Sequence, residues 1–290
     1  MTVEVLRYAA FTAEGEGGKP TGVVLDAGCL ADAQMLAVAQ ALGYSGTAFL
    51  LPPETAGDQF GIRYFSPRGE VALCDHATIA TAVAHAERHG VGRLQLLTAA
   101  GPVPVDTQHT TAGITATLTS PPASTRPLAP AVLERALTAL HWPRSELHRE
   151  YPPRVASAGT DHLVVGLVSP AVLDRVDHDD ALLGDLMANE GWTTVHAFWP
   201  EAAIRFHGRN VSHSGGGVEA PATCAAAAAL GGYLRDLGHL WSQHTVTLLQ
   251  GHHIGAPSRL LVRLASEGGR MKVTGAADPL TRFEYDQELM

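Results

Sequence analysis

One segment from the first half of this 290-residue chain recurs, in altered form, in the second half. The first copy reads GIRYFSPRGEVALCDHATIATA and the second reads AIRFHGRNVSHSGGGVEAPATCAAAAA. Both copies contain Ile-Arg-aromatic, a glycine-bearing turn, a glutamate, a cysteine and then an apolar, alanine-rich stretch. The arginine-to-cysteine spacing is wider in the second copy (Arg205 to Cys224) than in the first (Arg63 to Cys74). Such a repeat predicts two similar subdomains related by a pseudo-two-fold axis, with a site between them.

The two repeated cysteines, Cys74 and Cys224, stand where a loop turns into an alanine-rich helix. A helix N-terminus offers unpaired backbone N–H groups and the positive end of the helix dipole. Such a position lowers the pKa of a thiol and favours the thiolate. If both helix starts face one cleft, the pair can remove a proton from one point of a substrate and return it at another.

The hydrophobic pattern predicts a mixed α and β chain. Helices are expected over 77–89, which ends at a glycine, and over 223–237, and alternating β-formers such as VEVLRYAAF predict strands. A proline-rich stretch, SPPASTRPLAPAVLE, is the expected connection between the halves. We therefore expect subdomains over 1–122 and 123–290, with the last strand or tail free to return to the first subdomain.

Composition limits the class of protein. Hydrophobic residues make up 46% and charged residues 17% of the chain, which is typical of a globular protein. The net charge is −9 and the basic residues are scattered, which argues against a nucleic-acid partner. Three cysteines do not form a disulfide framework, so we expect a reducing, cytoplasmic location. The N-terminus does not resemble a signal peptide, and no apolar run is long enough to predict a membrane span.

The motifs, taken in order, resemble the PhzF-like family of phenazine biosynthesis, within the diaminopimelate epimerase-like superfamily. They extend from Tyr8 to Ser258 and read GGKPTGVVLDA, YSGTAFLLPP, IRYFSPRGEVALCDHATIATA, TAAGPVPV, GVEAPATCAAAAALGGYL and QGHHIGAPSRLLV. The resemblance implies an α+β fold of two pseudo-symmetric subdomains, each a β-barrel-like sheet around a central helix. It also implies an active site between them, cofactor-independent isomerisation, epimerisation or racemisation, and a homodimer.

Four departures from the family pattern, in three motifs, fall at the implied active site. The glutamate base of the family's Ser-Glu-Thr motif is Gly46 here, and an acid, Asp75, replaces the glycine of Cys-Gly-His-Ala-Thr. In the second half, Ala220 replaces the family's aspartate and Cys224 stands where the family has glycine. Cys224 lies one position beyond the second cysteine of the epimerase and racemase branches, where Thr223 falls.

These departures leave several candidates for moving the proton. His76 and Cys224 lead, followed by Asp75, Cys74 and Glu219. Histidine titrates near neutral pH, and an adjacent acid or helix terminus shifts its pKa. Each candidate also has a structural interpretation. In that interpretation the cysteines are small apolar packing residues, Asp75 is the N-cap of the first helix, and Glu219 only caps the approach to the second helix.

Substrate binding is assigned to the residues around both helix starts. Hydroxyl and backbone N–H groups there are expected to hold a substrate carboxylate, at Gly46, Thr47, Thr78, Thr223 and Ala225. The histidines lack clustered partners, so we expect no metal, and the resemblance implies no cofactor.

The sequence thus predicts a cofactor-independent isomerase that shifts a proton and a double bond in a small, carboxylate-bearing, amino-acid-derived metabolite of secondary metabolism. Two alternatives stay open. A two-base racemase or epimerase would use Cys74 and Cys224, and a non-catalytic small-acid binding protein would explain the missing glutamate and aspartate.

Overall fold

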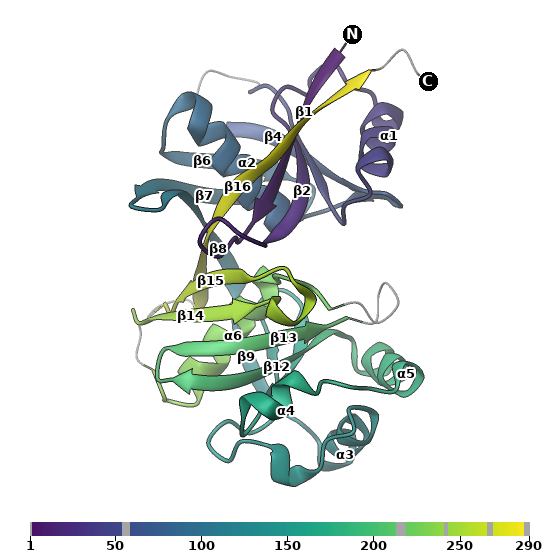
Figure 1. Cartoon of the computed structure of the whole chain (residues 1–290), viewed down its shortest axis with the longest axis vertical. Coiled ribbons are helices and arrows are strands. Elements are labelled where there is room, and N and C mark those ends of the chain that lie inside the picture. Colours follow the sequence, from purple (N-terminus) through teal and green to yellow (C-terminus); the bar gives the residue numbers. More distant parts are fainter. Residues whose placement is uncertain (1, 54–58, 213–218, 241–242, 266–268, 287–290) are drawn as a thin grey trace. The chain divides into compact units, whose positions relative to one another are not determined.

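A computed structural model of the chain divides into two units, and the last residues of the chain belong to the first of them. The first unit consists of residues 1–119 and 274–290, and the second of residues 120–273. The described residues are 2–53, 59–212, 219–240, 243–265 and 269–286 (Figure 1). The division lies close to the predicted boundary after residue 122, and the last segment is counted with the first unit.

The first unit is a closed β-barrel. Its strands are β1 (Thr2–Ala10), β2 (Lys19–Val24), β3 (Thr47–Leu50), β4 (Gln59–Ser66), β6 (Arg93–Thr98), β7 (Gly101–Thr110), β8 (Gly113–Pro122) and the later part of β16 (Arg270–Asp286). The strands are hydrogen-bonded in the order β1-β2-β3-β4-β6-β7-β8-β16, and β16 pairs with β1 to close the ring. A short strand, β5 (Gly69–Val71), pairs with β4 at the edge.

Helix α2 (Asp75–His89) lies inside this ring of strands (Figure 1). Most of its side chains are buried alanine, threonine, valine or isoleucine, because only small side chains fit inside a barrel of eight strands. The helix starts two residues before the predicted position and ends at Gly90, as predicted. Helix α1 (Asp32–Leu42) packs on the opposite face of the strands, where Met35 and Val38 join a cluster with Val24 and Phe49.

The second unit repeats this plan with an open sheet. Its strands are β9 (Ser124–Pro127), β10 (Arg154–Ser157), β11 (Asp161–Gly166), β12 (Trp192–Ala202), β13 (Arg205–Val211), β14 (Thr245–Gln250), β15 (Ser258–Arg263) and the start of β16. They are hydrogen-bonded in the order β16-β15-β14-β13-β12-β11-β10-β9. The sheet curves around helix α6 (Cys224–Asp236), which contacts β9, β10 and β11 on one side and β15 on the other.

Helix α6 approaches its sheet closely because two of its residues lack a Cβ. A methyl group at Gly231 would lie 2.8 Å from Val262, and one at Gly232 would lie 2.6 Å from Ala123. Three further helices, α3 (Pro130–Ala139), α4 (Pro170–Asp174) and α5 (Asp180–Glu190), cover the other face of the sheet through a second apolar cluster. Two 3-10 turns, η1 (Arg144–Glu146) and η2 (His252–Ile254), complete this unit.

The predicted fold is confirmed, because each unit places one alanine-rich helix against a sheet that curves around it. Within the described residues, no helix combines the length and apolar character needed to cross a bilayer. All three cysteines are described, and none forms a disulfide.

Candidate active site

In the first unit, the start of α2 brings together a histidine, a thiol and a hydroxyl. The His76 ring lies with Nδ1 3.4 Å and Nε2 3.6 Å from the Sγ atom of Cys74. The Oγ atom of Ser45 lies 3.4 Å from Nε2 of the same ring. Cys74 is the N-cap residue of α2, and both Cys74 and His76 are buried.

Burial sets the charge of this pair. Desolvation lowers the pKa of His76 well below 6.5, and the nearby Lys19 ammonium lowers it further. Desolvation raises the pKa of Cys74 to about 11, although the Ala77 N–H and the Lys19 charge act in the opposite direction. At neutral pH the site therefore contains a neutral imidazole, which accepts a proton, beside a neutral thiol, which can donate one.

The expectation of a thiolate at Cys74 is therefore wrong. The helix N-terminus does act in the predicted direction, because the N–H group of Ala77 at the start of α2 lowers the pKa of the thiol. Burial outweighs this effect, since a buried thiolate loses its hydration. Sequence alone does not report how deeply the N-cap position is buried.

Gly46 is packed directly against this pair. A Cβ atom at position 46 would lie 2.4 Å from Sγ of Cys74 and 3.5 Å from the His76 ring. Any side chain there, including the glutamate that the family pattern leads one to expect, requires the Cys74 thiol to move. The absence of a side chain at Gly46 and the placement of the thiol beside His76 thus depend on each other.

We expect Gly46→Ala to displace the Cys74 side chain from His76 and to lower stability by about 1–3 kcal/mol, the usual cost of overpacking. Gly92→Ala is the matched control in the same unit, because nothing lies within 4 Å of a Cβ atom built there. Urea unfolding of both variants measures the difference. Equal midpoints for the two variants would contradict the close contact at Gly46.

Two of the threonines assigned to substrate are used by the protein itself or enclosed in it. The Thr78 hydroxyl donates to the Cys74 carbonyl at 2.9 Å and lies 2.6 Å from the Tyr64 hydroxyl. Thr78 is fully buried and fixes the start of α2, which favours a structural role, and its binding of substrate stays a prediction. Thr47, on β3, is also fully buried, and its hydroxyl has no hydrogen-bond partner among the described residues.

Asp75 is the first residue of α2, so the capping position belongs to Cys74 and the interpretation of Asp75 as an N-cap is wrong. Asp75 is half-buried, and a negative charge in the first turn is favoured by the helix dipole. Its charge raises the pKa values of Cys74, Tyr64 and Lys19. Asp75 therefore affects the site through the electrostatic effect of its charge on these pKa values.

Lys19 is the residue of this site that sequence reasoning missed. It begins β2, and its charge acts on both Cys74 and His76. Two residues along the same strand, the buried Thr21 donates from Oγ1 to the Gly46 carbonyl at 2.8 Å. Residues i and i+2 of a strand share a face, so Lys19 and Thr21 both face the start of α2. That alternation within the GGKPTG motif was the available signal.

In the second unit, helix α6 begins at Cys224 and its N-cap residue is Thr223. Thr223 therefore occupies the helical position that Cys74 occupies in the first unit, and Cys224 lies one position later. Cys224 is buried and Ala225 is half-buried. The Thr223 hydroxyl is buried and has no hydrogen-bond partner among the described residues. The offset of one residue predicted from the sequence is thus present in the helix register.

Glu219 is held by a buried ion pair. Nε and Nη2 of Arg209 donate to Oε2 of Glu219 at 2.9 and 2.7 Å, and Nη1 also donates to the carbonyl groups of Leu173 and Asp174. Both side chains of the pair are largely buried. This favours the structural interpretation of Glu219, in which it anchors the segment before α6 instead of acting as a catalytic acid.

Ala220 stands where the family has aspartate, and both its backbone N–H and its carbonyl group are hydrogen-bonded. Its N–H donates to the Asn210 carbonyl at 3.1 Å, and its carbonyl accepts from Nε2 of Gln250 at 2.6 Å. Asn210 and Gln250 are fully buried. The loop entering α6 is therefore held at its backbone, once by the Asn210 carbonyl and once by the Gln250 side chain. No sequence motif predicted these contacts.

Burial also predicts which thiols react. We expect iodoacetamide to modify Cys29, which is exposed, and to leave Cys74 and Cys224 unmodified in the folded protein at neutral pH. Peptide mapping by mass spectrometry identifies the modified residue, and Cys29→Ser is the control that abolishes native labelling. Labelling of Cys74 as fast as Cys29 would contradict the pKa shift described above.

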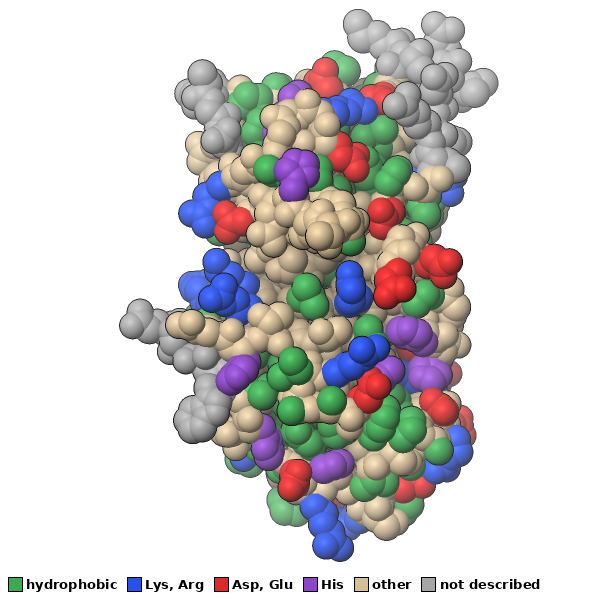
Figure 2. All heavy atoms as spheres, turned by 60° about the vertical axis from the view of Figure 1, so that its left-hand side comes forward, with side chains coloured by type: hydrophobic (Ala, Val, Ile, Leu, Met, Phe, Trp, Pro, Cys, Tyr) green, Lys and Arg blue, Asp and Glu red, His purple; other side chains and the backbone are tan. Residues whose placement is uncertain are grey.

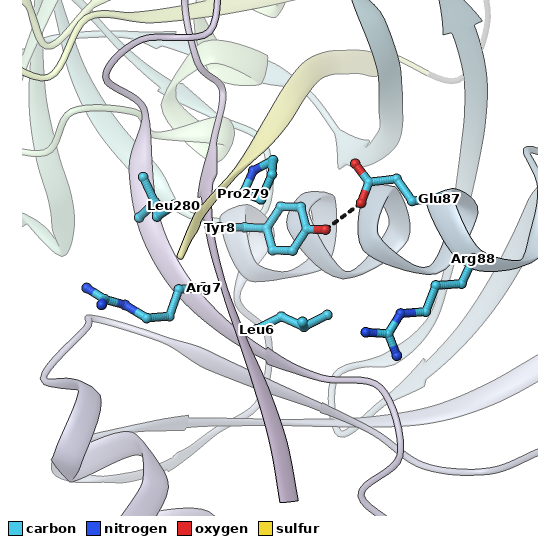
Figure 3. A pocket seen from close by; sticks show the side chains of 7 residues that line it. All are labelled: Leu6, Arg7, Tyr8, Glu87, Arg88, Pro279 and Leu280. Carbon is cyan, nitrogen blue, oxygen red and sulfur yellow. Dashed lines mark hydrogen bonds between the residues drawn. The ribbon is translucent and has the colours of Figure 1, made fainter. Parts of the chain in front are cut away.

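A cavity of about 510 Å³ in the first unit lies at the other end of α2 (Figure 3). It is lined by Leu6, Arg7, Tyr8, Glu87, Arg88, Pro279 and Leu280. Glu87 and Arg88 belong to the last turn of α2, roughly 20 Å along the helix from Asp75. Its polar groups are paired, since Tyr8 donates to Glu87 at 2.5 Å and Arg88 donates to Glu4 at 2.8 Å. This cavity is separate from the cluster around His76.

On the face seen in Figure 2, Lys and Arg side chains lie in several separate places, interspersed with acidic ones. Within the described part of the chain, no group of three or more His, Cys, Asp or Glu side chains is arranged to hold a metal ion.

Comparison with known proteins places these features in context. The profile of the family described as "Phenazine biosynthesis-like protein" (PhzC-PhzF) matches residues 8–282. The uncharacterized isomerase YfhB of Bacillus subtilis is 30% identical over 94% of this chain and 95% of that protein. Trans-2,3-dihydro-3-hydroxyanthranilate isomerase of Pseudomonas chlororaphis is 30% identical over 95% and 92%. A PhzF-family structure from Bacillus anthracis superimposes with a TM-score of 0.86 at 24% identity, over 98% and 99% of the two chains.

Proposed function

We propose, from the premise that this chain belongs to the phenazine biosynthesis-like (PhzC-PhzF) family and is an isomerase, that it shifts a proton and a double bond in a small carboxylate-bearing metabolite. The observation that carries this proposal is the pair at the start of α2. A neutral imidazole lies 3.4 Å from a neutral thiol, and the glutamate expected at position 46 is missing.

His76 is the base of the proposed reaction. It takes a proton from a carbon α or γ to a carbonyl or imine, so that a C–H bond breaks and an N–H bond forms. The electron pair left on carbon spreads over the conjugated group, and a proton returned to its far end completes the shift of the double bond. The substrate is neither oxidised nor reduced.

The returned proton comes from a thiol or from His76 itself. Cys74 is the first donor in this proposal, because its sulfur lies 3.4 Å from the His76 ring. Its raised pKa keeps that sulfur protonated at neutral pH. Cys224, at the first position of α6, is the second donor in this proposal. Backbone N–H groups at the helix starts stabilise the anionic intermediate.

The proposed substrate class is an amino-acid-derived, unsaturated acid of secondary metabolism. Support comes from a relative named trans-2,3-dihydro-3-hydroxyanthranilate isomerase, whose named substrate is a cyclic, unsaturated amino acid. Its sequence is similar over nearly the full length of both chains.

NMR in deuterated water tests this proposal with a panel of amino acids and unsaturated amino-acid-derived acids. A double-bond isomerase moves the olefinic signals and introduces deuterium at a new carbon. Deuterium at Cα with inversion of configuration would instead identify a racemase or epimerase. Ligand binding by thermal shift without any exchange would identify a binding protein and overturn the proposal.

A further inference from the structure

The cations of this chain are almost all arginine. The sequence contains 20 Lys and Arg residues, and lysine occurs only at positions 19 and 272. Lys272 is exposed on β16, whereas Lys19 is half-buried at the start of β2. A lysine partly removed from water is costly unless a negative charge compensates it. The position of Lys19 therefore calls for an explanation.

The backbone fixes where Lys19 starts its strand. Gly18 has a φ of +79°, and a Cβ atom there would lie 2.8 Å from the Ala10 carbonyl oxygen and 2.9 Å from the Thr12 side chain. This tight approach pairs Lys19 directly with Ala10 of β1. Thr21 then faces Gly46, and strand alternation brings Lys19 to the same face.

The surrounding charges do not fully compensate the ammonium group. Lys19 forms no ion pair with a carboxylate among the described residues, and the carboxylate of α2 whose charge acts on its pKa is Asp75. Burial lowers the pKa of Lys19 more than Cys74 and Asp75 raise it. The positive dipole end of α2 faces the same region, which adds to the excess positive charge.

We propose that the Lys19 ammonium binds the carboxylate of the substrate beside His76. This rests on the proposed function for the identity of the substrate, and it gives Lys19 a role in binding beyond its effect on the pKa values of Cys74 and His76. A substrate anion supplies the missing compensation, and it leaves His76 and Cys74 to handle the proton. Lys19 is then a specificity residue that selects acids over their neutral analogues.

A matched pair of ligands tests the recognition of the carboxylate without turnover. Anthranilate and aniline share an aromatic amine, and only anthranilate carries the acid. We expect anthranilate to stabilise the wild-type protein in a thermal shift assay and aniline to have no effect. Lys19→Gln is expected to weaken anthranilate binding by about 10- to 100-fold, the range for a lost charge-assisted contact. Lys19→Arg, which keeps the charge, is expected to retain most of the binding.

Lys272→Gln is the matched control, because it removes the other lysine from an exposed position. The scarcity of lysine also gives a direct spectroscopic signal. After reductive methylation with ¹³C-formaldehyde, which preserves the charge, NMR resolves two dimethyl-lysine signals, and Lys272→Arg assigns them. Anthranilate is expected to shift the Lys19 signal and not that of Lys272.

Three results would overturn the proposal. The first is equal anthranilate binding by wild type and Lys19→Gln, and the second is equal binding of aniline and anthranilate. The third is a Lys19 NMR signal that none of anthranilate, benzoate and proline shifts.

Kinetics give a further test, since Lys19→Gln is expected to raise KM with little change in kcat. A fall in kcat at constant KM would make Lys19 a proton-handling group instead. Carboxylate binding without any proton exchange would leave this inference standing while the proposed isomerase function fails.

Discussion

Replacing His76 by asparagine is expected to lower kcat by about 10²- to 10⁴-fold, the usual contribution of a general base. The side chain of asparagine preserves polarity in the buried position but has no basic nitrogen. The measurement uses the substrate that the deuterium exchange panel identifies, with stability checked by thermal unfolding. Turnover at the wild-type rate by a folded His76→Asn variant would remove His76 from the mechanism.

Cys74→Ala and Cys224→Ala separate the role of the base from that of the acid. One proton is returned in each turnover, so only the variant of the thiol that returns it is expected to lose formation of the shifted product. That variant retains proton abstraction, which is measured as solvent exchange at the donor carbon, and the variant of the other thiol retains both. His76→Asn loses both. His109→Gln is the control for a histidine substitution in the same unit, because His109 is exposed. A loss of exchange in Cys74→Ala with normal exchange in His76→Asn would transfer the role of base to the thiol.

The pH dependence follows from the direction of the His76 shift. The base functions only when it is unprotonated, and burial keeps its pKa well below 6.5. The acidic limb of kcat/KM is therefore expected well below pH 6.5, where the profile of a solvent-exposed histidine would already have fallen.

The architecture could be predicted because it is carried by repeated local patterns. The alanine-rich stretches after Cys74 and before Leu237 have the small side chains that a helix inside a curved sheet requires. The end of the first helix could also be predicted, since Gly90 follows it directly. Family motifs added the correct order of the elements.

The charge state of the site could not be predicted in the same way. A helix start indicates a lowered thiol pKa, but the actual shift of Cys74 is decided by burial, which depends on strands distant in sequence. Likewise, nothing in the sequence near Glu219 indicates that Arg209, from β13, occupies its carboxylate. Lys19 was hidden for the same reason, since its neighbours Cys74 and Asp75 are more than fifty residues away.

The second unit is expected to lose stability steeply between pH 6.5 and 4. Two histidines on adjacent strands are fully buried there: His162 on β11 and His196 on β12. Burial lowers the pKa of His162 to about 3 and that of His196 to about 4. His162 lies 2.7 Å from the Thr194 hydroxyl and 3.1 Å from that of Thr160, so both ring nitrogens are engaged with neutral groups.

The sign follows from proton linkage. In the unfolded chain these histidines titrate near 6.5, so between pH 6.5 and 4 the unfolded state binds more protons than the folded state. The stabilising effect of the neutral rings is complete above pH 6.5 and is lost as the pH falls towards the folded pKa values. Two protons correspond to a slope of about 2.7 kcal/mol per pH unit, a large part of the stability of an ordinary domain.

Tryptophan fluorescence reports on this unit, because all four tryptophans of the sequence lie between residues 120 and 273. Urea unfolding at pH 7, 6, 5 and 4.5 gives the slope of the free energy of unfolding against pH. His196→Gln is expected to reduce that slope by about 1.4 kcal/mol per pH unit, one proton's share, whatever its effect on stability at pH 7. The exposed His109→Gln leaves the slope unchanged. A wild-type slope near zero would mean that His162 and His196 are protonated in the fold, because only groups that titrate differently in the two states make stability depend on pH.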